Sequence, residues 1–233
     1  MKRYLALVFS VLVIVAVYCG ITFSEDQIER PDVLPPNSPF KAKDFSHLSG
    51  MEGFSDKLLN NHLKLYQGYV KNTNILLDKL DALLNDNSEK TVEYAELERR
   101  LGWEYNGMLL HEYYFENLGG KDALSAESAL YKKITEEFGT FERWKKDFIG
   151  VGSMRGIGWA VLYFEPKTGK LLNIWVNEHN TGNIAGAIPL LVMDVFEHAY
   201  LTDYELDKAK YIESFFNNIN WKIAEGRFQK RSL

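Results

Sequence analysis

The chain has 233 residues, of which 46% are hydrophobic and 14% aromatic, and its formal net charge is −5 at pH 7. This length allows one sizeable core or two small ones, and the composition is typical of a packed globular protein rather than a disordered one. The acidic balance argues against nucleic-acid binding, which normally needs a basic face. Cys19 is the single cysteine, which excludes an internal disulfide framework and a thiolate zinc site. Any metal must therefore be held by His, Asp or Glu.

The N-terminal 24 residues differ in character from the rest of the chain. Lys2 and Arg3 precede an apolar run over residues 5–17. This pattern predicts that residues 1–24 are a signal peptide or an uncleaved N-terminal membrane anchor, and lipidation at Cys19 is a third alternative. We therefore expect an exported protein that is periplasmic, otherwise extracytoplasmic, or anchored to a membrane.

A proline-rich stretch follows in residues 25–45. Four of the six prolines of the chain fall there, at positions 31, 35, 36 and 39. Proline removes a backbone donor and opposes both helix and ladder hydrogen bonds, so the stretch is predicted to be an extended tether.

Two long helices are predicted in residues 46–120. Ser55 is a suitable N-cap for a first helix from Asp56 to about Leu84, in which apolar residues recur at helical spacing. A polar turn over residues 85–88 separates it from a second helix, from about Thr91 to Leu118, which Gly119-Gly120 would end. Two long helices with a short link predict an antiparallel hairpin.

The pattern changes after Gly120, where shorter helical and strand-like segments follow one another. Two helices, three strands and a closing helix are expected, over residues 125–138, 140–149, 156–164, 171–176, 188–195 and 205–217. The predicted fold class is α+β: a long N-terminal antiparallel helical hairpin, then a C-terminal domain, residues 121–233, with a three-stranded antiparallel sheet flanked by helices.

The candidate site residues are a few histidines and one aspartate. Asp194 and His198 lie four positions apart after an apolar run, a pair that is ambiguous alone because a solvated turn or a helix face gives the same spacing. His62 and His111 each lie on one predicted long helix, and antiparallel pairing can bring their imidazoles together. Three neutral nitrogens and one carboxylate suit Mn or Fe, with zinc as an alternative.

The segment Asp194-Val195-Phe196-Glu197-His198-Ala199-Tyr200 resembles the Asp-Val-Trp-Glu-His-Ala-Tyr signature of the iron/manganese superoxide dismutases. Phe196 replaces the Trp of that signature. Four further stretches are similar to segments of the family and occur in its order: 65–70, 106–115, 152–162 and 218–221. The likeness extends over roughly residues 40 to 228.

The resemblance implies a set of roles. His62, His111, Asp194 and His198 would be the metal ligands for one Mn or Fe ion per subunit. Tyr69 would be the gateway tyrosine beside the open coordination position, and His179 would hydrogen-bond to the solvent there. The family usually has a doubled His where this chain has Leu65 and Tyr66, and the distance from His62 to Tyr69 counts one residue short of the family pattern. His62 is still the candidate because this helix holds no other His.

The implied activity is disproportionation of superoxide to dioxygen and hydrogen peroxide by alternate reduction and oxidation of the metal. Glu197 resembles the residue that crosses a two-fold interface to a ligand His, which implies a homodimer. Two alternatives remain open. One is a non-catalytic metal-binding or structural envelope protein with the same fold. The other is a mononuclear iron oxygenase, whose usual β-barrel scaffold does not suit the helical pattern.

Overall fold

A computed structural model describes residues 38–230, and all of them lie in one compact unit, Leu34–Leu233. The predicted leader in residues 1–24 and most of the predicted tether lie outside the described residues. Within residues 38–230, no helix combines the length and the apolar character that crossing a bilayer requires.

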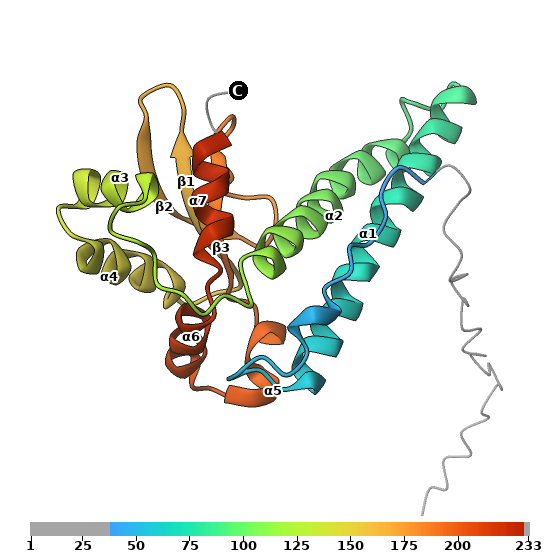
Figure 1. Cartoon of the computed structure of the whole chain (residues 1–233). Helices are drawn as coiled ribbons and strands as arrows, with labels where there is room; N and C mark the ends of the chain where they lie inside the picture. Colours follow the sequence, from blue (N-terminus) through green and yellow to red (C-terminus); the bar gives the residue numbers. More distant parts are fainter. Residues whose placement is uncertain (1–37, 231–233) are drawn as a thin grey trace, which may run out of the picture. The chain divides into compact units, whose positions relative to one another are not determined.

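The helical hairpin is present as predicted, with α1 (Asp56–Asn85) and α2 (Val92–Glu116) packed side by side (Figure 1). Each helix begins at a hydroxyl cap: Ser55 accepts a hydrogen bond from the Leu58 N–H, and Thr91 accepts one from Tyr94. A stripe of buried residues recurs every three or four positions on α1: Leu58, Leu59, His62, Tyr66, Tyr69, Val70 and Thr73. Within it, His62, Tyr66 and Tyr69 contact residues of α2. This stripe determines which side chains of α1 can reach the interior.

The segment before α1 lies along the hairpin and leads into a short 3₁₀ helix, η1 (Ser46–Leu48) (Figure 1). The buried Asn74 side chain pairs with the backbone of Phe40 in both directions, accepting from its N–H at 3.1 Å and donating to its carbonyl at 2.9 Å. The Lys43 N–H donates to the Tyr66 hydroxyl at 2.9 Å. These bonds fix the chain against α1 before the first helix begins.

The part after the hairpin contains two helices and a sheet. α3 (Ala129–Phe138) and α4 (Phe141–Gly152) are capped by Ser128 and Thr140, and Gly139 at φ 84° separates them. The sheet contains β1 (Gly158–Glu165), β2 (Lys170–Asn177) and β3 (Ile188–Asp194), in the order β2-β1-β3, and both pairs are antiparallel. The α+β prediction and the three-stranded antiparallel sheet are therefore confirmed.

The central strand β1 is buried along nearly its whole length, because β2 and β3 flank it and α4 packs against it. α4 contacts β1 and β2, whereas α2 and α7 (Trp221–Gln229) contact β3. The C-terminal end of β3 therefore lies against the inner end of the hairpin. This contact brings the two halves of the chain together at the candidate site.

The predicted closing helix over residues 205–217 is wrong in its first part. A single turn, α5 (Leu201–Tyr204), ends at Glu205, which has φ 50°, and α6 (Lys208–Asn217) begins only after the cap Asp207. A side chain in the left-handed region cannot continue a right-handed helix. The last helix, α7, was not predicted at all.

Candidate metal centre

Asp194 reaches the site as the last residue of β3. It pairs across the sheet with Trp159 of β1, whose position in the buried strand directs this end of β3 into the interior. The Phe196 N–H donates to Asp194 Oδ1 at 2.9 Å, which orients the carboxylate and leaves Oδ2 free to face inward. The chain then turns through the 3₁₀ helix η2 (Glu197–Ala199), and His198 returns so that its Nε2 lies 3.0 Å from that same Oδ2.

The hairpin supplies the other two imidazoles. His62 Nε2 lies 3.1 Å from Asp194 Oδ2, and His111 Nε2 lies 3.7 Å from it. Their rings meet edge to face with centroids 5.1 Å apart. Gly107, one turn before His111, makes room for this face of the hairpin, because a Cβ there would lie 2.6 Å from the Tyr69 ring.

The structure thus brings together the four residues predicted as ligands, His62, His111, Asp194 and His198. One donor atom from each lies within 4.8 Å of all the others. The side chains of His62, His111 and Asp194 are fully buried, whereas that of His198 is 26% exposed. A buried carboxylate with three imidazole nitrogens around one point is a donor set suited to a metal cation.

The spacing of His62 is no obstacle to its place in this set. His62 and Tyr69 are seven residues apart, which is about two turns, and both belong to the buried stripe of α1. The doubled His of the family is absent here: Leu65 is partly exposed, while Tyr66 is buried and donates a hydrogen bond to Glu112 at 2.9 Å. Tyr66 therefore belongs to the packing of the hairpin.

Protonation in the cluster favours cation binding. His111 Nδ1 lies 2.6 Å from the Gly107 carbonyl, which can only accept, so the neutral ring carries its proton there and has its lone pair on Nε2. That Nε2 is buried and has no hydrogen-bond partner in the described part of the chain, and the same holds for His62 Nδ1. Burial lowers the pKa of His62 and lowers that of His111 further, so both imidazoles are neutral at pH 7.

The carboxylate remains charged in the same environment. Burial opposes the ionisation of Asp194, but electrostatic attraction to His198 and the hydrogen bonds with His198 and His62 outweigh it and hold the pKa of Asp194 well below its usual range. A charged carboxylate beside the neutral imidazoles of His62 and His111 is a protonation state that suits a metal ligand set.

Tyr69 and His179 form a pair beside the four donors. His179 Nε2 lies 2.9 Å from the Tyr69 hydroxyl, and the Tyr69 ring stacks on His111 with centroids 5.0 Å apart. The Trp159 Nε1–H donates to His179 Nδ1 at 3.1 Å. Because indole nitrogen only donates, Nδ1 accepts and Nε2 carries the proton of the neutral imidazole. The sequence predicted His179 and Tyr69, and the structure places both next to the cluster.

Three residues around His179, namely Trp103, Trp159 and Glu178, are given no role by the sequence pattern. Trp103 lies edge to face against His179 with centroids 4.5 Å apart, and Phe196, which the sequence did single out, stacks on the His179 ring at 4.9 Å. Trp159 sat inside a recognised stretch, but only the strand register shows that it faces His179. Glu178 and Trp103 lie 75 positions apart, so no local pattern could have paired them.

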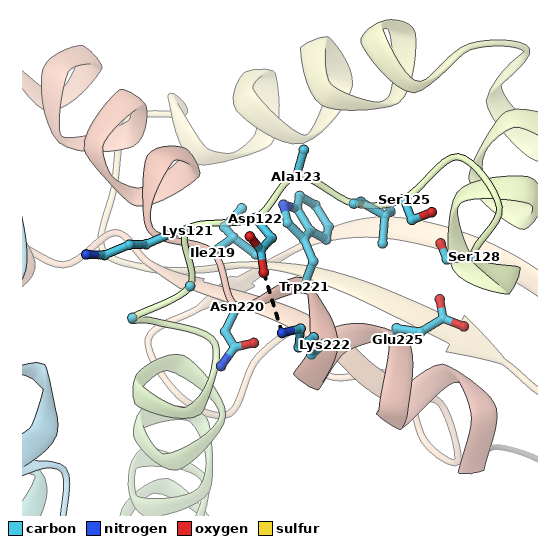
Figure 2. A pocket seen from close by; sticks show the side chains of 13 residues that line it. Lys121, Asp122, Ala123, Ser125, Ser128, Ile219, Asn220, Trp221, Lys222 and Glu225 are labelled. Carbon is cyan, nitrogen blue, oxygen red and sulfur yellow. Dashed lines mark ion pairs between the residues drawn. The ribbon is translucent and has the colours of Figure 1, made fainter.

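A separate hollow of about 510 Å³ lies between the α2–α3 connection and the start of α7 (Figure 2). Its acidic groups already have partners. Lys222 pairs with Asp122 at 3.4 Å, and the Glu225 carboxylate accepts from the N–H groups of Ala129 and Leu130. None of the four clustered donors lines this hollow, which therefore offers no comparable chemistry.

Comparison with known proteins agrees with the geometry. Residues 126–227 match the model of the C-terminal domain of iron/manganese superoxide dismutases. The chain is 37% identical over 195 residues to a protein named superoxide dismutase (Fe) of Aquifex pyrophilus, an alignment that covers 81% of this chain and 90% of that protein. It is 37% identical over 177 residues to one of the same name from Methanothermobacter thermautotrophicus, with 75% and 85% covered. For superoxide dismutase (Mn/Fe) of Aeropyrum pernix the identity is 32% over 173 residues, with 73% and 80% covered. The chain belongs to the iron/manganese superoxide dismutase family.

Proposed function

We propose that this protein is a superoxide dismutase that holds one Mn or Fe ion per subunit on His62, His111, Asp194 and His198. The observation that carries the proposal is the buried convergence of these four donors, within 4.8 Å of one another, in a chain of this family. The bound ion would supply one-electron chemistry, since alternate reduction and oxidation convert two superoxide ions to dioxygen and hydrogen peroxide.

The donor set favours Mn or Fe over zinc. Three imidazoles and a single carboxylate bring one negative charge, which balances part of the charge of a divalent or trivalent cation while neutral nitrogens fill the remaining positions. Zinc accepts the same donors but has no accessible second oxidation state, so it could not support this reaction.

The chain positions a proton beside the site through Tyr69 and His179. With Trp159 donating to Nδ1, His179 donates from Nε2 to the Tyr69 oxygen, which leaves the Tyr69 O–H free to donate to a small anion. Burial lowers the pKa of His179 to about 4, and burial also raises the pKa of Tyr69 above its ordinary value. Both groups therefore keep these protonation states across the physiological pH range.

The experiment that tests the function is metal analysis of purified protein combined with a superoxide-consumption assay. The protein would be expressed once with manganese supplied and once with iron. We expect close to one ion per chain and superoxide consumption that rises with the occupancy of the active metal. Stoichiometric Mn and Fe without superoxide consumption would contradict the proposal and favour the alternative, a non-catalytic metal-binding or structural envelope protein.

We further propose that the protein forms a homodimer through the surface around Glu197. The Glu197 carboxylate is exposed and forms no hydrogen bond or ion pair within residues 38–230. The neighbouring His198 is the one partly exposed member of the cluster, and its Nδ1 has no hydrogen bond in the same part of the chain. A two-fold axis there would let each Glu197 orient the His198 of the partner.

Analytical ultracentrifugation tests this assembly. We expect a dimer for the unaltered chain and a shift toward monomer, with reduced metal retention, for Glu197→Ala. Glu213→Ala, which removes an exposed carboxylate on α6, is the matched control and should remain dimeric. If the unaltered chain is monomeric, the proposed homodimer is refuted, and the proposed set of metal ligands is unaffected by that result.

For location we propose export, with the chain acting outside the cytoplasm or tethered to a membrane. Support comes from the basic and apolar sequence of residues 1–24 alone. Cell fractionation that recovers the full-length chain in the cytosol would refute it.

A further inference from the structure

Trp103 lies over the outer side of the Tyr69–His179 pair. Its ring, which projects from α2, contacts His179 edge to face at 4.5 Å and the Tyr69 ring at 5.5 Å. Trp103 is only half-buried, whereas His179 is fully buried and Tyr69 nearly so. The indole is therefore a wall between this pair and solvent.

A single hydrogen bond ties this wall to the loop that carries His179. The Trp103 Nε1–H donates to Glu178 Oε2 at 2.9 Å, and Glu178 directly precedes His179. A hydrogen bond to a charged carboxylate is stronger than a hydrogen bond of the same geometry between two neutral groups. The bond joins α2 to the segment after β2. Another contact between these two elements here is the one between the rings of Trp103 and His179.

In the loop after β2, the adjacent side chains of Glu178 and His179 point in opposite directions. Asn177 and Thr181 bond each other through their backbones, at 2.8 Å and 3.3 Å, and close a tight turn around His179. Glu178 has φ 48°, a left-handed conformation that is uncommon for a residue with a side chain. This conformation points the carboxylate outward to Trp103 while the next residue points inward to Tyr69, and such strain persists where surrounding contacts stabilise it.

Trp103 is also restrained on its face. The Arg100 guanidinium lies 3.9 Å from the centroid of the indole ring, and the buried Glu104 holds that guanidinium at 2.6 Å. Cation–π stacking fixes the plane of the ring, and the Glu178 bond fixes its edge. With both its plane and its edge restrained, the Trp103 indole is held in a single orientation against His179.

We propose that Glu178 and Trp103 form a latch that positions His179 against Tyr69. The latch consists of the Glu178 carboxylate and the Trp103 indole, and neither is a ligand of the metal centre. The inference rests on the proposed function, in which the Tyr69–His179 pair supplies a positioned proton. Opening the latch would admit water beside His179 and loosen its bond to Tyr69.

The test compares three variants of the metal-loaded protein. Glu178→Leu removes the acceptor, Trp103→Phe keeps a ring but removes the donor, and Glu178→Gln retains an acceptor oxygen. Loss of one such hydrogen bond predicts a fall in kcat of about two- to tenfold in the first two variants, with unchanged metal content. Glu178→Gln should restore most of the lost rate, and Glu213→Leu controls for the lost surface charge.

A double-mutant cycle separates a latch from two independent structural effects. If the two side chains act through one bond, Glu178→Leu combined with Trp103→Phe should lower kcat no further than either change alone. Hydrogen–deuterium exchange of the backbone amides of residues 177–181, followed by mass spectrometry, gives a readout that does not depend on turnover. Exchange should accelerate equally in both single variants and in the double variant, and remain slow in Glu178→Gln.

Additive losses of kcat, or unchanged exchange in Glu178→Leu, would overturn the latch. Failure of the proposed function gives a different result: the unaltered, metal-loaded protein would consume no superoxide, while the exchange measurements would still report on the latch.

Discussion

The helical hairpin and the segment from β3 to η2 each supply two of the four clustered donors, but in different ways. His62 and His111 come from two helices and meet only because α1 and α2 pack along their buried stripes. Asp194 and His198 lie within one turn of chain, and their approach depends on the local path after the strand. The hairpin pair is thus a product of packing, whereas the other pair is nearly a property of five consecutive residues. Variants in each region test this difference.

The largest effect is expected from Asp194→Asn, because Asp194 Oδ2 is the atom that both halves face. The change keeps the shape but removes the buried charge and turns a donor group toward the imidazoles. Losing one partner of a buried charged cluster corresponds to a fall in metal affinity of about a thousandfold. Elemental analysis should find the protein metal-free and the superoxide assay inactive, with the helical circular dichroism retained. Stoichiometric metal in this variant would show that Asp194 is not a ligand.

His62→Ala tests the hairpin side alone. We expect metal affinity to fall by at least about a hundredfold, since changes even to groups that merely support ligands cost ten- to a hundredfold. Leu65→Ala, on the same helix but partly exposed, is the control and should bind metal as the unaltered chain does. Equal metal affinities in competition titrations with a chelator would remove His62 from the ligand set.

The pH dependence of stability tests the pair beside the cluster. Burial lowers the pKa of His179 to about 4, below the value of about 6.5 expected in the unfolded chain. The unfolded state therefore binds the extra proton first, so the contribution of His179 is present above pH 6.5 and is lost as the pH falls toward 4. The contribution is at most about 3 kcal/mol of the free energy of unfolding.

Urea unfolding of the unaltered chain and of His179→Gln, at pH values between 4.5 and 7, checks this expectation. The difference between the two free energies of unfolding should shrink as the pH falls, because glutamine does not titrate. A difference that stays constant over this range would show that His179 does not contribute through its protonation.

The smallest effect is expected on the solvent-facing side of α2. Arg99 and Glu96 pair at 3.2 Å, but their side chains are 72% and 62% exposed. Exposed ion pairs of this kind contribute less than about 0.5 kcal/mol, so Arg99→Ala should leave both metal content and the urea midpoint nearly unchanged. A marked loss of either would show that the outer face of the hairpin also supports the site.

Local sequence was sufficient where caps and periodicity agree. Ser55 and the apolar spacing after it predicted the start of α1, and Gly139 divided α3 from α4. The break at Glu205 could not be predicted in the same way, because neither Gly nor Pro marks it and the left-handed φ is imposed by its surroundings. The missed helix α7 is nine residues long, which is too short for its periodicity to stand out.

Caps, helical periodicity and the spacing of Asp194 and His198 are local properties of the chain, so the α+β order of elements and the candidate ligands could be inferred from the sequence alone. The convergence of the four donors, and the orientation of His179 toward Tyr69 rather than solvent, depend on tertiary packing. The same packing places Trp103 against Glu178. Most of these contacts join residues far apart in the chain, such as His62 and Asp194, which lie 132 positions apart, so helix packing and strand register set them rather than any local pattern.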